Sequence, residues 1–171
     1  MYWLAIPIAL ALGKLISSSF STEEKEAKKN WEQNKRKVEK KLEEHKRFIK
    51  QNIDQCNKSY DYQFLKDMHY SSFIVADSAY KLLKDVQLIL IGINKMILDL
   101  KRKKDKKRAS EFRKELFKER DNISMESNRM RNKLNELNIQ TGNLKYIIRD
   151  KCGVEGKEWF ERLEARKQKR K

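Results

Sequence analysis

Apolar residues recur along most of this chain at alternating spacings of three and four positions. Such spacing places the apolar side chains on one face of an α-helix. The longest series predicts a central helix over residues 62–100, and further apolar residues beside it widen the face enough to contact two neighbouring helices. The series consists of Leu65, Met68, Ser72, Val75, Ala79, Leu82, Val86, Ile89, Ile93, Met96 and Leu100.

Two further series of heptad type predict helices over residues 22–57 and 108–140. Polar residues interrupt both of them: Lys35 and Asn52 in the first, Glu119 and Glu126 in the second. A seam with polar gaps is typical of a coiled-coil-like helix of moderate stability. The apolar or weakly polar members are Trp31, Val38, Leu42, His45, Ile49 and Cys56 in the first helix, and Ala109, Phe112, Leu116, Ile123, Met130, Leu134, Leu137 and Leu144 in the second.

Residues at the ends of these series are typical of helix boundaries. Ser21 is expected to cap the first helix, with Glu24 completing a capping box, and Asp61 to cap the second. Residues 141–143 (Thr-Gly-Asn) are expected to break the third helix. A short helix then ends at Gly153, where glycine favours a C-terminal stop. Gly156 is expected to open a last amphipathic helix.

These elements predict an all-α fold, an antiparallel three-helix bundle of long coiled-coil-like helices. The chain divides into an apolar N-terminal helix (1–20), the bundle (21–140), and short C-terminal helices with a basic tail (141–171). In an up-down-up bundle, residues 101–108 return the chain to the end where the first helix begins. The alternative is that residues 101–108, which contain no glycine or proline, continue as one helix.

The first twenty residues, MYWLAIPIALALGKLISSSF, form the densest apolar run. Positive residues follow this run, an order that favours an anchor with its N-terminus outside and the bundle on the cytoplasmic, inner face of a membrane. Residues 2–16 span about 22 Å as a helix against about 30 Å of hydrocarbon, so Lys14 would have to reach back to the interface. The residues expected to insert are Tyr2, Trp3, Leu4, Ile6, Ile8, Leu10 and Leu12.

Two alternatives for this segment remain open. A cleaved secretory signal has its positive charge before the apolar stretch, whereas here the order is reversed. A helix buried against the bundle or a partner subunit would be covered by protein instead of lipid. Within the segment Ala5, Ala9 and Gly13 form a stripe of small residues that would let helices pack closely in lipid.

The net charge of +16 predicts an acidic partner surface. Seven of the eight residues 101–108 are basic, and an anionic membrane is the partner we expect. Nucleic acid is a second possibility, and its binding would be non-specific because no aromatic residue interleaves with this charge. The residues expected to bind anionic lipid or phosphate are Lys14, Lys25, Lys28, Lys29, Lys101, Arg102, Lys103, Lys104, Lys106, Lys107 and Arg108.

No motif for catalysis, metal or cofactor binding stands out, and no small-molecule substrate is expected. His45 and His69, the only histidines, lie within predicted helices and are interpreted as structural. Trp159, Phe160 and Leu163 share one face of the last helix and predict a docking site for a protein partner or a second copy.

The sequence therefore predicts a non-enzymatic, membrane-associated helical adaptor, scaffold or effector that binds anionic lipid and a protein partner. One alternative is a soluble, basic nucleic-acid-binding subunit of a larger complex. Another is an oligomeric effector that permeabilises membranes through the small-residue stripe.

Overall fold

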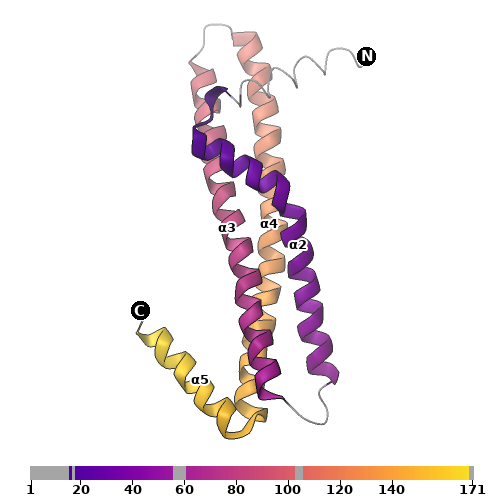
Figure 1. The fold of residues 1–171 in the computed structure, drawn as a ribbon. Helices are drawn as coiled ribbons and strands as arrows, with labels where there is room; N and C mark the ends of the chain where they lie inside the picture. The colour runs from indigo at the N-terminus through magenta and orange to yellow at the C-terminus, as the bar shows by residue number, and fades with distance from the viewer. Residues whose placement is uncertain (1–15, 17, 56–60, 103–105, 170–171) are drawn as a thin grey trace. The chain divides into compact units, whose positions relative to one another are not determined.

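The structure, a computed structural model, describes residues 16, 18–55, 61–102 and 106–169, and it is all-helical over this part of the chain (Figure 1). The predicted all-α class is therefore confirmed, and the three predicted long helices correspond to the first three that the structure labels. The helices are α2 (Thr22–Gln55), α3 (Tyr62–Lys101), α4 (Lys106–Lys151) and α5 (Gly153–Gln168).

The predicted helix starts are confirmed by side-chain hydrogen bonds. Ser21 N donates to Glu24 Oε2 (2.7 Å), and Glu24 N donates to Ser21 Oγ (3.2 Å). This reciprocal pair is a capping box, which satisfies two backbone donors that the helix itself leaves without an acceptor. At the start of α3, Phe64 N donates to Asp61 Oδ1 (3.1 Å).

The chain divides into two compact units, each built from part of α2, part of α3 and part of α4. Unit 1 comprises Met1–Arg36 and Tyr80–Met130, and unit 2 comprises Lys37–Ala79 and Arg131–Lys171, which includes α5.

In unit 1, ion pairs between helices define the direction of α2 relative to α4. Lys28 Nζ of α2 lies 3.1 Å from Glu119 Oε1 of α4, and Lys35 Nζ lies 2.5 Å from Glu126 Oε2. From the first ion pair to the second, the residue number rises in both helices, so α2 and α4 are parallel here. Gly92 of α3 packs beneath Phe20, two residues before α2, so α3 also contacts the segment that leads into α2.

Unit 2 shows the same pairing. Lys133 of α4 contacts Glu43 (3.5 Å) and Glu136 contacts Lys46 (2.5 Å), so α2 and α4 are parallel. Toward α3 the order reverses. His45 Nε2 lies 2.9 Å from Ser72 Oγ, whereas Phe48, later in α2, contacts Phe64, earlier in α3, with ring centroids 6.2 Å apart.

The predicted apolar seams form the core of both units. All members of the α3 series are buried except Val75, which is half-buried. In α2 the buried seam residues include Trp31, Leu42 and Ile49. The corresponding buried residues of α4 are Ala109, Leu116, Ile123, Met130, Leu134, Leu137 and Leu144.

The predicted break at residues 141–143 is wrong, because α4 continues to Lys151. Thr141 continues the seam from Leu137 toward Leu144, and it is buried. Its hydroxyl donates to the carbonyl of Leu137 (2.9 Å), which keeps the polar group satisfied within the helix. A glycine inside a helix destabilises it by about 1 kcal/mol relative to alanine, which is less than the stabilisation gained by burying this seam.

The chain turns sharply between α4 and α5, as Figure 1 shows. Gly153 has φ +61°, a backbone conformation that is unfavourable for residues with a Cβ atom. The predicted glycine stop at this position is therefore confirmed. The last helix begins at Gly153, so the prediction that Gly156 opens it is wrong. Gly156 instead allows close approach: a Cβ there would lie 2.1 Å from the carbonyl oxygen of Ile148.

Candidate functional site

Most of the residues expected to contact a membrane lie outside the described part of the chain. These are the inserting residues and the small-residue stripe within residues 2–13, together with Lys14, Lys103 and Lys104. Lys106, Lys107 and Arg108 lie in the first turn of α4, and their side chains are also outside the described set. The structure therefore leaves these predictions as they were.

The described members of the predicted anion-binding set all lie in unit 1. Lys25 and Lys29 are exposed in the first turns of α2, and Lys101 and Arg102 are exposed at the end of α3. Lys28 differs from them because it is half-buried and forms ion pairs with Glu119 of α4 (3.1 Å) and Glu32 (3.8 Å). Its charge is thus already matched within the protein.

The residues that end the predicted apolar segment are covered by protein. Ile16 and Phe20 are 7% and 4% exposed. A Cβ on Gly92 of α3 would lie 2.8 Å from Phe20 Cε1, so the absence of a side chain at Gly92 makes the space for this ring. The end of the apolar run is thereby fixed to α3, nine residues before Lys101.

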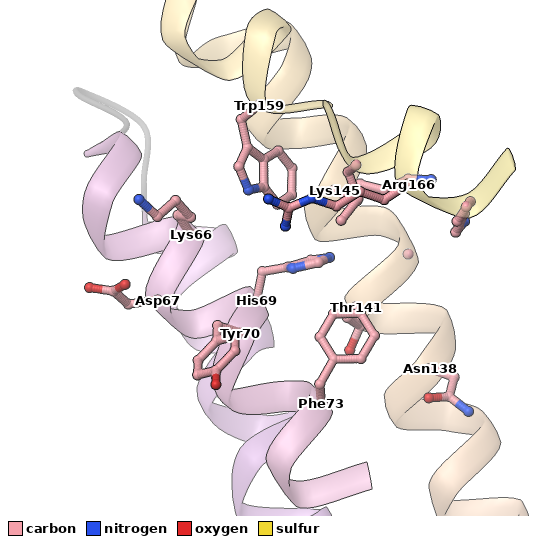
Figure 2. A pocket seen from close by; sticks show the side chains of 13 residues that line it. Lys66, Asp67, His69, Tyr70, Phe73, Asn138, Thr141, Lys145, Trp159 and Arg166 are labelled. Atoms are coloured by element: carbon pink, nitrogen blue, oxygen red, sulfur yellow. The ribbon is translucent and has the colours of Figure 1, made fainter. Parts of the chain in front are cut away.

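A cleft of about 660 Å³ lies in unit 2, and we call it the aromatic cleft (Figure 2). Each of its three walls is one stripe of a helix, with residues three or four positions apart. The walls are Lys66, Asp67, His69, Tyr70 and Phe73 of α3; Asn138, Thr141, Gly142 and Lys145 of α4; and Trp159, Leu163, Arg166 and Lys167 of α5.

Aromatic rings form most of one side of the aromatic cleft. The imidazole of His69 makes edge-to-face contacts with Phe73 (centroids 5.0 Å apart) and with Trp159 (4.9 Å). Figure 2 shows His69 and Phe73 of α3 facing α4, with Trp159 of α5 above them. Tyr70 and Phe73 are 67% and 53% exposed, so the cleft has apolar walls that the described residues leave open.

His69 contributes a neutral ring to the aromatic cleft at neutral pH. The residue is 4% exposed, and burial lowers the pKa of its imidazole from 6.5 to about 4. Burial is the largest cause of this lowering, and the positive charges of Lys145 and Lys167 contribute to it. The interpretation of His69 as a packed residue is consistent with this burial.

Cationic side chains lie along the α4 and α5 walls. Lys145 Nζ lies 2.7 Å from Glu164 Oε1, and Lys167 Nζ lies 3.5 Å from the same oxygen. The hydrogen bond from Lys145 is the main reason that the pKa of Glu164 is lowered. Arg166 is exposed. Two lysines share one carboxylate here, so these walls keep an excess of positive charge.

The three predicted docking residues do not all line the same site. Trp159 and Leu163 line the aromatic cleft. Phe160 packs instead on Tyr146 of α4, with ring centroids 5.8 Å apart. Lys145 and Arg149 lie over both of these rings at about 5 Å, a cation–π cluster that joins α4 to α5.

The α3 wall of the aromatic cleft was not predicted from the sequence. A signal was present, because Lys66, His69, Tyr70 and Phe73 follow one another at helical spacing beside the main seam. Aromatic residues on the second face of an amphipathic helix indicate that something covers that face. The missing information was the position of α5.

None of the helices in the described part of the chain combines the length and apolar composition needed to cross a bilayer. Over the same residues, His, Cys, Asp and Glu side chains form no group of three or more able to hold a metal ion. No protein-family model matches the chain, and no curated protein or solved structure matches it either.

Proposed function

We propose that this protein is a non-enzymatic helical scaffold or adaptor that associates with an anionic membrane surface through the N-terminal end of unit 1. The apolar residues 1–15 would insert, and the basic residues near them would hold acidic headgroups. We propose with it that the fold is an antiparallel three-helix bundle with an additional apolar N-terminal helix. The bundle would lie on the inner face of the membrane.

The packing of Phe20 on Gly92 is the observation that carries the proposal. It ties the end of the apolar run to the same unit as the end of α3, where the basic stretch 101–108 begins. Lys25, Lys29, Lys101 and Arg102 are exposed in this unit and free of described ion pairs. Each such charge contributes about 1 kcal/mol near an anionic membrane, and an inserted apolar segment adds a second signal.

Sedimentation with phosphatidylserine vesicles tests the proposal. We compare the full chain with two truncated proteins that start at Ile16 and at Ser21. The protein that starts at Ile16 retains Ile16 and Phe20, whose burial fills space in unit 1, so its loss of binding would report on residues 1–15 alone. The protein that starts at Ser21 lacks this packing and serves as the measure of any folding defect.

Charge reversals in the full chain distinguish binding through the basic end of unit 1 from binding through the overall net charge. Lys101→Glu with Arg102→Glu should weaken sedimentation with phosphatidylserine. Lys151→Glu with Lys157→Glu, two exposed residues of unit 2, changes the net charge equally and should have little effect. Equal sedimentation of all these proteins would contradict the proposal. Salt-sensitive binding to RNA that survives removal of residues 1–15 would favour the nucleic-acid alternative.

A further inference from the structure

The aromatic cleft points to a second binding activity, in the other unit from the basic end. We propose that it binds a single-chain anionic amphiphile, an alkyl chain that ends in a carboxylate or phosphate. The apolar chain would lie against Tyr70, Phe73 and Trp159, and the anionic group would contact Arg166 and Lys167. This activity goes beyond the proposed membrane association and does not depend on it.

The size and composition of the aromatic cleft fit the apolar part of such a ligand. Its volume of about 660 Å³ lies within the range of about 300–1,000 Å³ that is typical of small-molecule sites. Few polar groups face it that are not already engaged. The hydroxyl of Thr141 donates to Leu137, and the ring of His69 is held edge-to-face by Phe73 and Trp159. An alkyl chain needs no hydrogen-bond partners, so these walls suit it.

Gly142 leaves space on the α4 side of the cleft because it has no side chain. A Cβ at this position would have no heavy atom within 4 Å, so the space above the backbone is open. Larger residues at the same position of the stripe would fill part of the cleft. This makes Gly142 the natural place to block the site without disturbing the seam on the other face of α4.

Charge complementarity selects an anion. Lys66, Lys145, Arg166 and Lys167 line the aromatic cleft, against Asp67 alone among the acidic residues of its walls. Asp67 accepts hydrogen bonds from Gln63 (2.9 and 3.0 Å), and Glu164, outside the lining, is shared by Lys145 and Lys167. Arg166 has no ion pair or hydrogen bond among the described residues, so its guanidinium is available for a carboxylate or phosphate.

Isothermal titration of the full chain with dodecanoate below its micellar concentration tests the proposal. We expect saturable binding with one site per chain. Each methylene removed from the ligand should weaken binding roughly fourfold, because less apolar surface is buried. Dodecyl phosphate should bind as well, whereas dodecanol should bind at least tenfold more weakly.

Two pairs of variants locate the site. Gly142→Leu should abolish binding, whereas Asn143→Leu, at the next and exposed position of α4, should leave it unchanged. Arg166→Glu should weaken binding roughly tenfold, and Lys157→Glu, an exposed residue of the same helix outside the lining, should not. Circular dichroism of each variant shows whether it is folded, and the Arg166 pair keeps the test decisive if Gly142→Leu does not fold.

Several results would overturn the proposal. They are absence of dodecanoate binding, equal binding of dodecanol, and unchanged binding in both Gly142→Leu and Arg166→Glu. A dimer that Gly142→Leu abolishes, with no dodecanoate binding by the native chain, would assign the cleft to a second copy instead. Binding of phosphatidylglycerol vesicles that Gly142→Leu weakens would support the proposal and identify a membrane lipid as the source of the ligand.

Discussion

Lys35 of α2 and Glu126 of α4 meet across the interior of unit 1, with Lys35 Nζ 2.5 Å from Glu126 Oε2. These two residues are polar interruptions in two separate apolar seams. The contact shows that each interruption faces the other, so opposite charges meet where two apolar side chains would otherwise pack. Both side chains are about one-quarter exposed, which leaves them partly solvated.

Reversal of one of these charges should destabilise the protein. We expect Lys35→Glu to lower the free energy of unfolding by about 1–3 kcal/mol, because two carboxylates would then face each other in a partly buried site. The double variant Lys35→Glu with Glu126→Lys should restore most of the loss. Urea unfolding followed by circular dichroism measures these free energies.

The exposed pair Lys40 and Glu44 provides the control for this cycle. Their side chains are 77% and 61% exposed, and their charged atoms lie 3.5 Å apart. The same reversal and exchange there should change stability by less than about 0.5 kcal/mol. Equal changes in the free energy of unfolding at the two pairs would show that the contact between Lys35 and Glu126 stabilises the protein no more than an exposed ion pair does.

The packing of Phe20 on Gly92 predicts a dependence between the two positions. In the native chain, a Cβ at Gly92 would meet Phe20 Cε1 at 2.8 Å and Glu24 Cδ at 2.9 Å. Gly92→Ala should therefore fail to show the gain of about 1 kcal/mol that alanine usually gives inside a helix. In a Phe20→Ala background part of this gain should appear, because only the contact with Glu24 then remains. Thermal unfolding of the four proteins measures the coupling, and additive effects would contradict the contact.

Three glycines near the end of α4 should respond to alanine in different ways. Gly142→Ala should stabilise the protein by about 0.5–1 kcal/mol, because the position is helical and nothing lies within 4 Å of the new Cβ. Gly153→Ala should destabilise it by about 1 kcal/mol, since the backbone there has φ +61°. Gly156→Ala should have the largest cost because its Cβ would strike the carbonyl of Ile148. Denaturant unfolding ranks the three variants.

A destabilising Gly142→Ala would mean that α4 is broken near residue 142 after all. For Gly156→Ala, loss of the fluorescence signature of Trp159 would report directly whether α5 has moved away from α3, because Trp159 contacts His69 of that helix. The other two tryptophans, Trp3 and Trp31, should be replaced by phenylalanine first so that one emitter remains.

His69 predicts a loss of stability in acid. Its pKa is about 4 in the folded protein and near 6.5 when the chain unfolds, so the unfolded state binds the proton more readily. The stabilising effect of the neutral ring is present above pH 6.5 and is lost as the pH falls from 6.5 to 4. The loss amounts to at most about 3 kcal/mol.

The charged groups around His69 come from all three walls: Lys66 and Asp67 on α3, Lys145 on α4, and Glu164 and Lys167 on α5. These groups are present in both the native chain and His69→Phe, so the difference between the two proteins isolates the imidazole. Urea unfolding at several pH values should show a smaller acid loss in His69→Phe. Identical curves would contradict the proposed burial of a neutral ring.

The helices themselves were predictable because their cores repeat at helical spacing and their first turns carry local caps. Ser21 with Glu24 and Asp61 are recognisable within a few residues of sequence. The break expected at residues 141–143 was wrong because local propensity favoured a stop, whereas Thr141 and Leu144 gain burial only when neighbouring helices are present. Packing against neighbouring helices therefore determines that residues 141–143 are helical.

The aromatic cleft was beyond prediction for a related reason. Its walls come from three helices, and their meeting depends on the turn at Gly153 and the close approach at Gly156. The sequence indicates glycine at both positions, but it does not reveal the direction in which α5 leaves α4. Trp159, Phe160 and Leu163 were predicted to share one face, of which Phe160 lies outside the cleft, and the facing residues on α3 were not predicted.

The parallel contacts between α2 and α4 have a consequence for the evolution of the chain. Lys28 with Glu119 and Lys35 with Glu126 share one sequence separation, 91 residues. A single insertion or deletion between the paired positions, unless the connecting segments absorbed it, would shift every such pair at once. In descendants of this sequence we therefore expect charge at these positions to change in coordinated pairs, and changes of length to accumulate between the helices instead of within them.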